Sequence, residues 1–123
     1  MKAAVLTVSD GVSSGARADE SGDVLAELLK GEGYEVERRV VPDERDAIAE
    51  AIAELAGEAA LVLTTGGTGV APRDVTPEAT VEVLDRQTPG LAEAIRAHVR
   101  EHDLAAWIGA QLDDLDRSSA RVP

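Results

Sequence analysis

The chain has 123 residues, of which 44% are hydrophobic, so its length and composition suit one compact domain with a real core and argue against wholesale disorder. There are 24 acidic residues against 12 basic ones, which gives a net charge of −12, and the only aromatic residues are Tyr34 and Trp107. The chain therefore lacks both the basic patch and the stacking platform of a nucleic-acid-binding protein. It has no cysteine, which excludes a disulfide framework, a thiolate zinc site and a cysteine nucleophile.

The sequence also predicts a soluble, cytoplasmic domain with no membrane partner. No apolar run approaches the roughly 18 residues of a membrane span, and the first residues lead directly into a strand-like segment without a signal peptide. His98 and His102 lie four residues apart, but they lack the HExxH pattern, so we expect a packing or solvent-facing role. An anionic ligand would need backbone donors, helix N-termini or a divalent cation to overcome the negative charge of the chain.

Three segments have the pattern of strands. The continuous apolar run 3–8 is typical of a strand that is buried on both faces, and residues 34–41 alternate as in a less buried strand. Residues 59–63 are again fully apolar and predict a third, buried strand.

Helix-like segments follow each strand. Residues 23–30 carry apolar positions at helical spacing, and Gly31 and Gly33 stop that helix. A second helix is expected to end near Gly57, and two more to begin at Thr76 and Pro89, where Leu91, Ile95 and Val99 share one face. This alternation predicts an α/β fold in which an open, mostly parallel sheet carries helices on both faces, giving three layers.

The unusual polar residues follow the carboxyl ends of the predicted strands. Ser9 and Asp10 follow the first strand, Asp43 follows the second, and the run TTGGTG at 64–69 follows the third. Ligands of open parallel sheets bind beyond the carboxyl ends of the strands, so these loops predict the site.

The glycine-rich run indicates a binding site for phosphate or pyrophosphate. Gly66, Gly67 and Gly69 let backbone N–H groups approach a ligand, and the hydroxyls of Thr65 and Thr68 add further donors. The run is neither a Walker A loop nor a dinucleotide fingerprint. A plain glycine turn between a strand and a helix is the alternative.

The acidic residues beside these loops each allow two interpretations. Asp74 could face bound phosphates, where it would hold Mg²⁺ or orient the transferring group, or it could be an acid at a helix N-terminus. Asp43 and Asp10 could belong to the site at the strand ends, or they could be ordinary turn acids. Arg73 could pair with a substrate phosphate or cover a helix end.

Four segments are similar to one known family: VLTVSDGVSSG, VVPDE, TTGGTGVAPRDVTPEAT and DRQTPGLAEAIR. Over about residues 3–100 the chain resembles the MogA/MoaB family of molybdenum cofactor proteins, most closely the MogA-type molybdopterin adenylyltransferases. The resemblance implies a MoaB/Mog-like domain over residues 1–102 and a cytoplasmic homotrimer. It also implies transfer of AMP from Mg-ATP to the terminal phosphate of molybdopterin, with release of pyrophosphate.

The resemblance further implies roles for individual residues. Asp43 and Asp74 would be catalytic, with Asp74 also at the Mg²⁺ ion. The substrate-binding residues would be Ser9, Asp10, Ser21, Gly22, Thr65, Gly66, Gly67, Thr68 and Gly69. Two alternatives stay open: a non-catalytic or inactive molybdopterin-binding protein of the same fold, and a general nucleotide-binding α/β domain.

The last part of the chain departs from the family. Beyond Arg96, family members continue with a serine-arginine segment, another strand, a PG-containing loop and a closing helix, whereas this chain ends in HVREHDLAAWIGAQLDDLDRSSARVP. We expect a C-terminally truncated domain with an atypical tail at 103–123. A frameshift or premature stop would explain the tail, and so would a natural short variant. In the tail, Leu104, Ile108, Leu112 and Leu115 are expected to form a helical stripe, and the final residues to fray.

Overall fold

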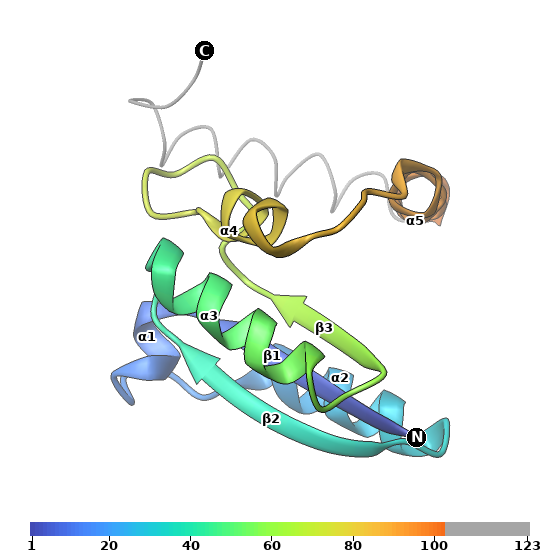
Figure 1. Cartoon of the computed structure of the whole chain (residues 1–123), viewed down its shortest axis with the longest axis horizontal. Helices are drawn as coiled ribbons and strands as arrows, with labels where there is room; N and C mark the ends of the chain where they lie inside the picture. The colour runs from blue at the N-terminus through green and yellow to red at the C-terminus, as the bar shows by residue number, and fades with distance from the viewer. Residues whose placement is uncertain (103–123) are drawn as a thin grey trace. The chain divides into compact units, whose positions relative to one another are not determined.

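A computed structural model describes residues 1–102 of the chain (Figure 1). The predictions for the tail at 103–123 lie outside the described residues. The described residues divide into two compact units, one formed by Met1–Thr68 with Arg73–Val83 and the other by Gly69–Pro72 with residues 84–102. The elements in chain order are β1 (Lys2–Val8), α1 (Asp10–Ser13), α2 (Glu20–Gly31), β2 (Glu35–Val41), α3 (Arg45–Ala56), β3 (Leu61–Thr65), α4 (Thr76–Val83) and α5 (Pro89–His102).

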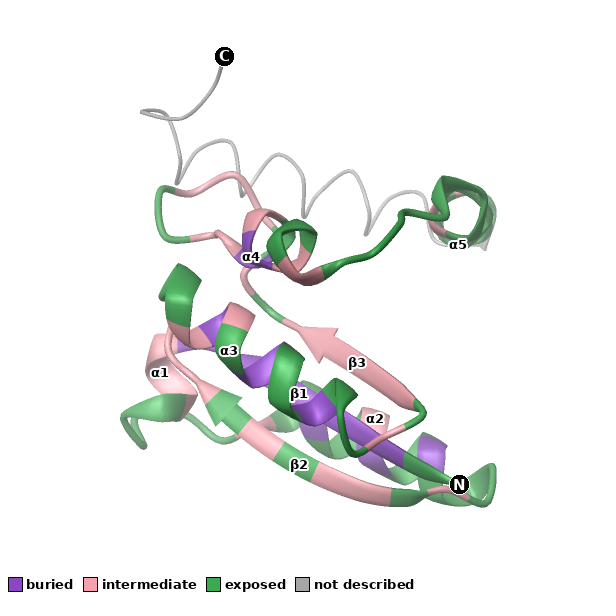
Figure 2. Cartoon of the chain, viewed as in Figure 1, coloured by how far each residue is buried: buried purple, intermediate pink, exposed green. Residues whose placement is uncertain are grey.

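The first unit is built on a parallel sheet of three strands in the order β2-β1-β3. Strand β1 pairs with β2 from Lys2 opposite Glu35 to Val8 opposite Val41. On its other side it pairs with β3 from Ala3 opposite Leu61 onward. Strand β1 is therefore central, and every residue in it after Lys2 is buried (Figure 2).

Helices cover both faces of this sheet. Successive residues of β1 point to opposite sides, so alternate residues pack against different helices. Ala3 and Val5 pack with Leu29 of α2 on one face. Ala4, Leu6 and Val8 pack on the other face with residues of α3 and α4, namely Ile48, Ala51, Ile52, Leu55 and Ala79. The predicted α/β architecture with helices on both faces is confirmed.

Two predicted elements differ from the observed ones by more than one residue at their start. Strand β3 begins at Leu61 rather than at residue 59, because the Ala59 N–H donates to the Leu55 carbonyl (2.9 Å) and stays with the end of α3. All five residues of β3 are half-buried rather than fully buried, since β3 is an edge strand of the described sheet. Helix α2 begins at Glu20, earlier than predicted, and the segment expected to be a loop before it contains the one-turn helix α1.

Helical spacing alone also overstated how much apolar surface is buried. In α2 the side chains of Val24 and Leu28 are 59% and 62% exposed, whereas Leu29 is buried. Helix α5, in the second unit, has the expected row of apolar residues, but Leu91 and Ile95 are largely exposed. No helix among residues 1–102 is long and apolar enough to span a membrane.

Candidate functional site

The carboxyl ends of the three strands surround a cavity of about 380 Å³ that lies wholly within the first unit. It is lined by residues from four loops and the first turn of α2, including Thr7, Ser9, Arg17, Asp19, Glu20, Ser21, Asp43, Thr65, Gly66, Gly67 and Asp74. The structure thus brings together the loops that follow each strand, as the sequence predicts for a parallel sheet.

Two of the predicted site residues, Asp10 and Asp43, join the first two loops. The backbone N–H of Asp10 donates to Asp43 Oδ2, and the backbone N–H of Asp43 donates to Asp10 Oδ1, both at 3.0 Å. Beside them, the Ser9 N–H donates to the Val41 carbonyl (3.0 Å), and the Ser9 hydroxyl accepts from the N–H of Val12 (3.2 Å). These hydrogen bonds fix the carboxyl ends of β1 and β2 against each other.

Arg73 reaches the same pair of loops from the segment after the glycine-rich run. Its Nε and Nη2 atoms donate to the two carboxylate oxygens of Asp10 at 2.6 and 2.9 Å. These bonds, together with the Asp43 N–H, hold the pKa of the Asp10 carboxyl below its usual value. The sequence suggested that Arg73 pairs with a substrate phosphate or covers a helix end, and neither interpretation included this bidentate ion pair with Asp10.

The first two glycines of the run lie so close to β1 and to Thr76 that these two positions require glycine. Gly66 and Gly67 have φ values of +96° and +66°. A Cβ atom at Gly66 would lie 2.1 Å from the Val8 carbonyl oxygen, and one at Gly67 would lie 2.3 Å from Thr76 Oγ1 and 3.1 Å from Asp43 Oδ1. The Thr76 hydroxyl donates to the Gly66 carbonyl (2.9 Å), and the Thr76 N–H donates to the Gly67 carbonyl (3.1 Å). The loop is therefore anchored to the start of α4.

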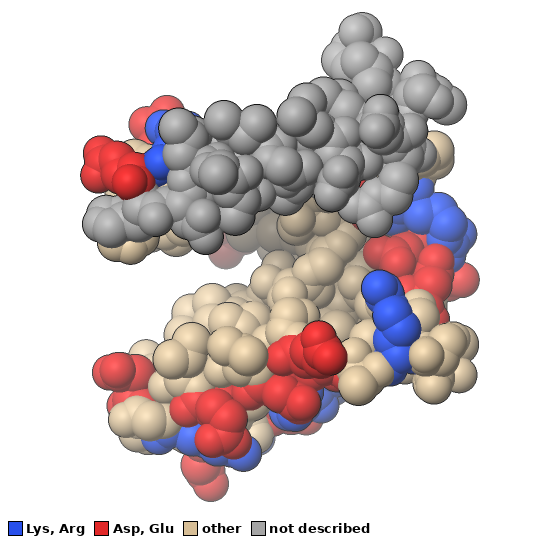
Figure 3. Space-filling model, turned by 180° about the vertical axis from the view of Figure 1, so that it is seen from behind, with Lys and Arg blue, Asp and Glu red and all other residues tan. Residues whose placement is uncertain are grey.

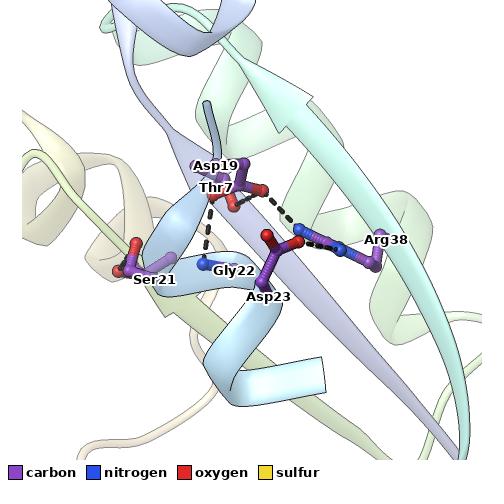
Figure 4. Close-up of polar contacts among 7 residues, drawn as sticks. Thr7, Asp19, Ser21, Gly22, Asp23 and Arg38 are labelled. Carbon is purple, nitrogen blue, oxygen red and sulfur yellow. Dashed lines mark hydrogen bonds and ion pairs between the residues drawn. The ribbon is translucent and has the colours of Figure 1, made fainter. Parts of the chain in front are cut away.

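The start of α2 forms the remaining wall, and its central residue, Asp19, was not predicted from the sequence. Figure 4 shows Asp19 at the N-terminus of α2, where its Oδ1 accepts from the N–H of Gly22 (3.1 Å) and its Oδ2 accepts from the hydroxyl of Thr7 (2.8 Å). Arg38 of β2 donates to Asp19 Oδ2 (2.8 Å) and to Asp23 Oδ1 (2.6 Å). An aspartate three residues before Gly22 is an N-cap signal, but the expected helix start at residue 23 concealed it.

Partial burial and hydrogen bonding have opposite effects on Asp19. Burial disfavours the charged carboxylate, but hydrogen bonds from Thr7, Arg38 and the Gly22 N–H outweigh it and lower the pKa of Asp19. Asp19 is thus a charged group in the cavity wall whose oxygens are already engaged by the protein.

The other predicted site residues are distributed unevenly. Ser21 and Thr65 line the cavity, where the Thr65 hydroxyl donates to Ser21 Oγ (3.1 Å), and Asp74 lines it as well. Gly22 is not among the lining residues, and it lies in the first turn of α2 with its N–H bonded to Asp19. Thr68 is exposed and is not among the lining residues, and Gly69 belongs to the second unit.

The carboxylates of the cavity fit one mode of Mg²⁺ binding and not another. Within residues 1–102, no group of three Asp, Glu or His side chains could hold a metal ion by itself. Mg²⁺ is often bound through one or two carboxylates together with substrate phosphates, and Asp43 and Asp74 line the same cavity. The donor set therefore suits an ion that arrives with a phosphate-bearing substrate.

A parallel α/β sheet with a polar cavity beyond its carboxyl ends defines a ligand-binding domain of the three-layer class. Residues 4–113 match the MoCF_biosynth family, described as "Probable molybdopterin binding domain". The chain belongs to this family, which confirms the resemblance found in the sequence.

Individual relatives agree with this assignment. The chain is 43% identical over 101 residues to the molybdopterin adenylyltransferase of Escherichia coli (strain K12), a match that covers 78% of this chain and 52% of the relative. Among solved structures it is similar to MoaB from Thermus thermophilus, with a TM-score of 0.73 and 45% identity over 78% of this chain and 62% of the other. It is also similar to the tungsten cofactor synthesizing protein MoaB from Pyrococcus furiosus, with a TM-score of 0.76 and 34% identity over 87% and 67% of the two chains. The chain spans about half the length of the curated relatives it matches.

Proposed function

We propose that this protein acts in molybdenum cofactor biosynthesis and transfers AMP from ATP to the terminal phosphate of molybdopterin. The observation that carries the proposal is the meeting of Asp43, Asp74 and the Gly66–Gly67 turn in one cavity beyond the strand ends. Identity of 43% to a molybdopterin adenylyltransferase supports the choice of reaction. In this reaction a phosphate oxygen of molybdopterin attacks the α-phosphorus of ATP, and pyrophosphate leaves.

In this proposal the chain positions two anionic reactants that repel each other. The backbone around Gly66 and Gly67 approaches a ligand without interference from side chains, and Ser9, Ser21 and Thr65 offer hydroxyls from three neighbouring segments. Asp43 is held by its bond from the Asp10 N–H, so its carboxylate has a fixed place in the cavity wall. Such fixed groups favour the reaction by holding the reacting atoms in line.

Magnesium is part of the same proposal. Asp43 and Asp74 would hold the ion together with the phosphates of ATP, and the ion would offset the charge of the triphosphate. From the family resemblance we further propose a cytoplasmic homotrimer. Sedimentation of the purified protein would test the trimer.

A second candidate is binding of molybdopterin without transfer, because the description of the matched family names binding alone. This candidate predicts tight binding of molybdopterin with no product formed from ATP.

Pyrophosphate release from molybdopterin and Mg-ATP tests the proposal. The full chain should release pyrophosphate only when both substrates and Mg²⁺ are present, and EDTA should abolish the release. Asp74→Ala should remove turnover. If the chain binds both substrates and pyrophosphate never appears, transfer is excluded and the binding role replaces it.

A further inference from the structure

The cavity wall is strongly acidic, with a single cationic side chain among its lining residues. The carboxylates of Asp19, Glu20, Asp43 and Asp74 line it, and within the described part of the chain Arg17 is the one arginine or lysine that does so. A phosphate-bearing ligand would meet these carboxylates as well as the overall charge of −12. A cationic side chain in the cavity wall therefore contributes more to the binding of an anion here than it would in a neutral protein.

Arg17 differs from the other arginines of the first unit in its partners. Arg38, Arg39 and Arg73 each have a carboxylate oxygen at 2.6 Å, and Arg45 is bonded to Glu82. Figure 3 shows blue and red side chains adjoining one another on one face of the molecule, as such pairing requires. Within the described residues, the guanidinium of Arg17 is bonded to the neutral hydroxyl of Ser9 (Nη2 to Oγ, 3.1 Å) and forms no ion pair.

The loop before α2 holds this guanidinium in the cavity. The N–H groups of Ala16 and Arg17 both donate to the Gly11 carbonyl, at 2.8 and 3.1 Å, so the backbone curls back on α1. A Cβ atom at Gly11 would lie 2.7 Å from Arg17 Nε and 3.3 Å from Nη2. The guanidinium thus lies against Gly11, in space that any other residue would occupy.

We propose that Arg17 binds a phosphate group of the substrate in this cavity. The guanidinium has several N–H donors in a planar fork that matches a phosphate, and only one of them is used by Ser9. Its charge is not neutralised by a carboxylate, and its side chain is exposed to an entering ligand. The inference rests on the proposed function and adds to it the residue that recognises the anion.

The phosphate can come from either substrate, so binding is measured separately for each. Isothermal titration of the full chain with Mg-ATP and with molybdopterin gives a Kd for each ligand. Arg17→Gln should weaken at least one of them about tenfold or more, because a charge-assisted hydrogen bond is lost. The ligand that loses affinity is the one whose phosphate Arg17 binds. Arg17→Lys should recover only part of the loss, because an ammonium group lacks the planar fork.

Gly11→Ala tests the same contact with Arg17 still present. The added methyl group would displace the guanidinium, which is the flexible end of the Arg17 side chain. The Kd of the ligand that Arg17→Gln weakens should therefore rise, while the protein stays folded. Matched controls are Arg39→Gln, an arginine paired with Glu54 outside the cavity, and Gly31→Ala, where a Cβ meets nothing within 4 Å. Both should bind as the unmodified chain does.

The outcomes separate the two proposals. If the unmodified chain binds neither ligand, the proposed function fails and the role of Arg17 fails with it. If it binds them and Arg17→Gln binds both equally well, the role of Arg17 is overturned while the proposed function stands.

Discussion

Asp10 and Asp43 exchange backbone-to-carboxylate hydrogen bonds of 3.0 Å in both directions, although they lie 33 residues apart in the chain. The arrangement resembles a capping box, in which two residues satisfy each other's backbone donors, but here it joins the ends of two neighbouring strands. Arg73 in addition donates hydrogen bonds to both carboxylate oxygens of Asp10. A candidate catalytic carboxylate is thus linked through Asp10 to the segment after the glycine-rich run.

Removing the Asp10 carboxylate should lower the melting temperature, because the Asp43 N–H and the Arg73 guanidinium both lose their acceptor. Asp10→Asn should be milder than Asp10→Ala, since its amide oxygen can still accept from the Asp43 N–H. Thermal unfolding followed by circular dichroism measures both. Glu58→Ala, at an exposed turn position outside this network, is the control.

The coupling to Arg73 can be measured separately. Arg73→Gln in the Asp10→Asn background should cost less stability than in the unmodified chain, because the pair is already broken. Strictly additive effects would contradict a direct interaction between these side chains in solution.

Much of the fold and part of the site could be predicted from the sequence. The apolar run of β1 predicted its burial, because a central parallel strand is covered on both faces. The same reasoning failed for β3, whose composition is similar, because position within a sheet is not encoded in the composition of a strand. Apolar spacing placed Val24 and Leu28 on a helix correctly, but it could not say which apolar residues would find a partner.

The site shows the same division between local and long-range information. Gly66, Gly67 and Asp43 were predicted because turn glycines and strand-end acids are visible in short windows of sequence. The pairs Arg73–Asp10 and Arg38–Asp19 join residues 63 and 19 positions apart, and no local pattern selects such partners among many charged residues. Asp19 alone could have been found, from its N-cap position before Gly22.

The stability of the chain should depend on pH through Asp19. Its pKa in the folded state lies below the ordinary value of 3.8, because bonds from Thr7 and Arg38 outweigh the effect of burial. A lowered folded pKa means that this contribution is fully present well above pH 3.8 and is lost as the pH falls through 3.8 toward the folded value. Urea unfolding across this acidic range should show a smaller loss of stability for Asp19→Asn than for the unmodified chain.

A matched variant tests the cause of this pH dependence. Arg38→Gln removes one of the bonds that lower the pKa of Asp19, so it should also reduce the acid-dependent loss of stability. Asp46→Asn changes a carboxylate whose side chain lies outside this network, and it should leave the Asp19 contribution intact. Equal pH profiles for Asp19→Asn and the unmodified chain would contradict the prediction.

Thr76→Val should reduce the free energy of unfolding by about 1 kcal/mol, the usual net contribution of one hydrogen bond. Thr76 is buried, and its hydroxyl donates to the Gly66 carbonyl, which ties the glycine-rich loop to α4. Thr76→Ser keeps this donor and should be less destabilising. Thr80→Val is a matched loss of one hydrogen bond, because the Thr80 hydroxyl bonds to the Thr76 carbonyl within the same helix and ties no loop, so it should cost a similar free energy. Urea denaturation of the four proteins would contradict the prediction if Thr76→Val were as stable as the unmodified chain.

Gly66→Ala and Gly15→Ala together separate backbone strain from steric overlap. Both glycines have positive φ, +96° and +81°, so each alanine should cost on the order of 1–3 kcal/mol of unfolding free energy from conformation alone. At Gly15 a Cβ meets nothing within 4 Å, whereas at Gly66 it would lie 2.1 Å from the Val8 carbonyl oxygen, a backbone atom of the central strand. Gly66→Ala should therefore be clearly the more destabilising, and it should also weaken ligand binding because the loop must move away from β1. Equal melting temperatures for the two variants would show that the glycine-rich loop does not approach Val8 this closely in solution.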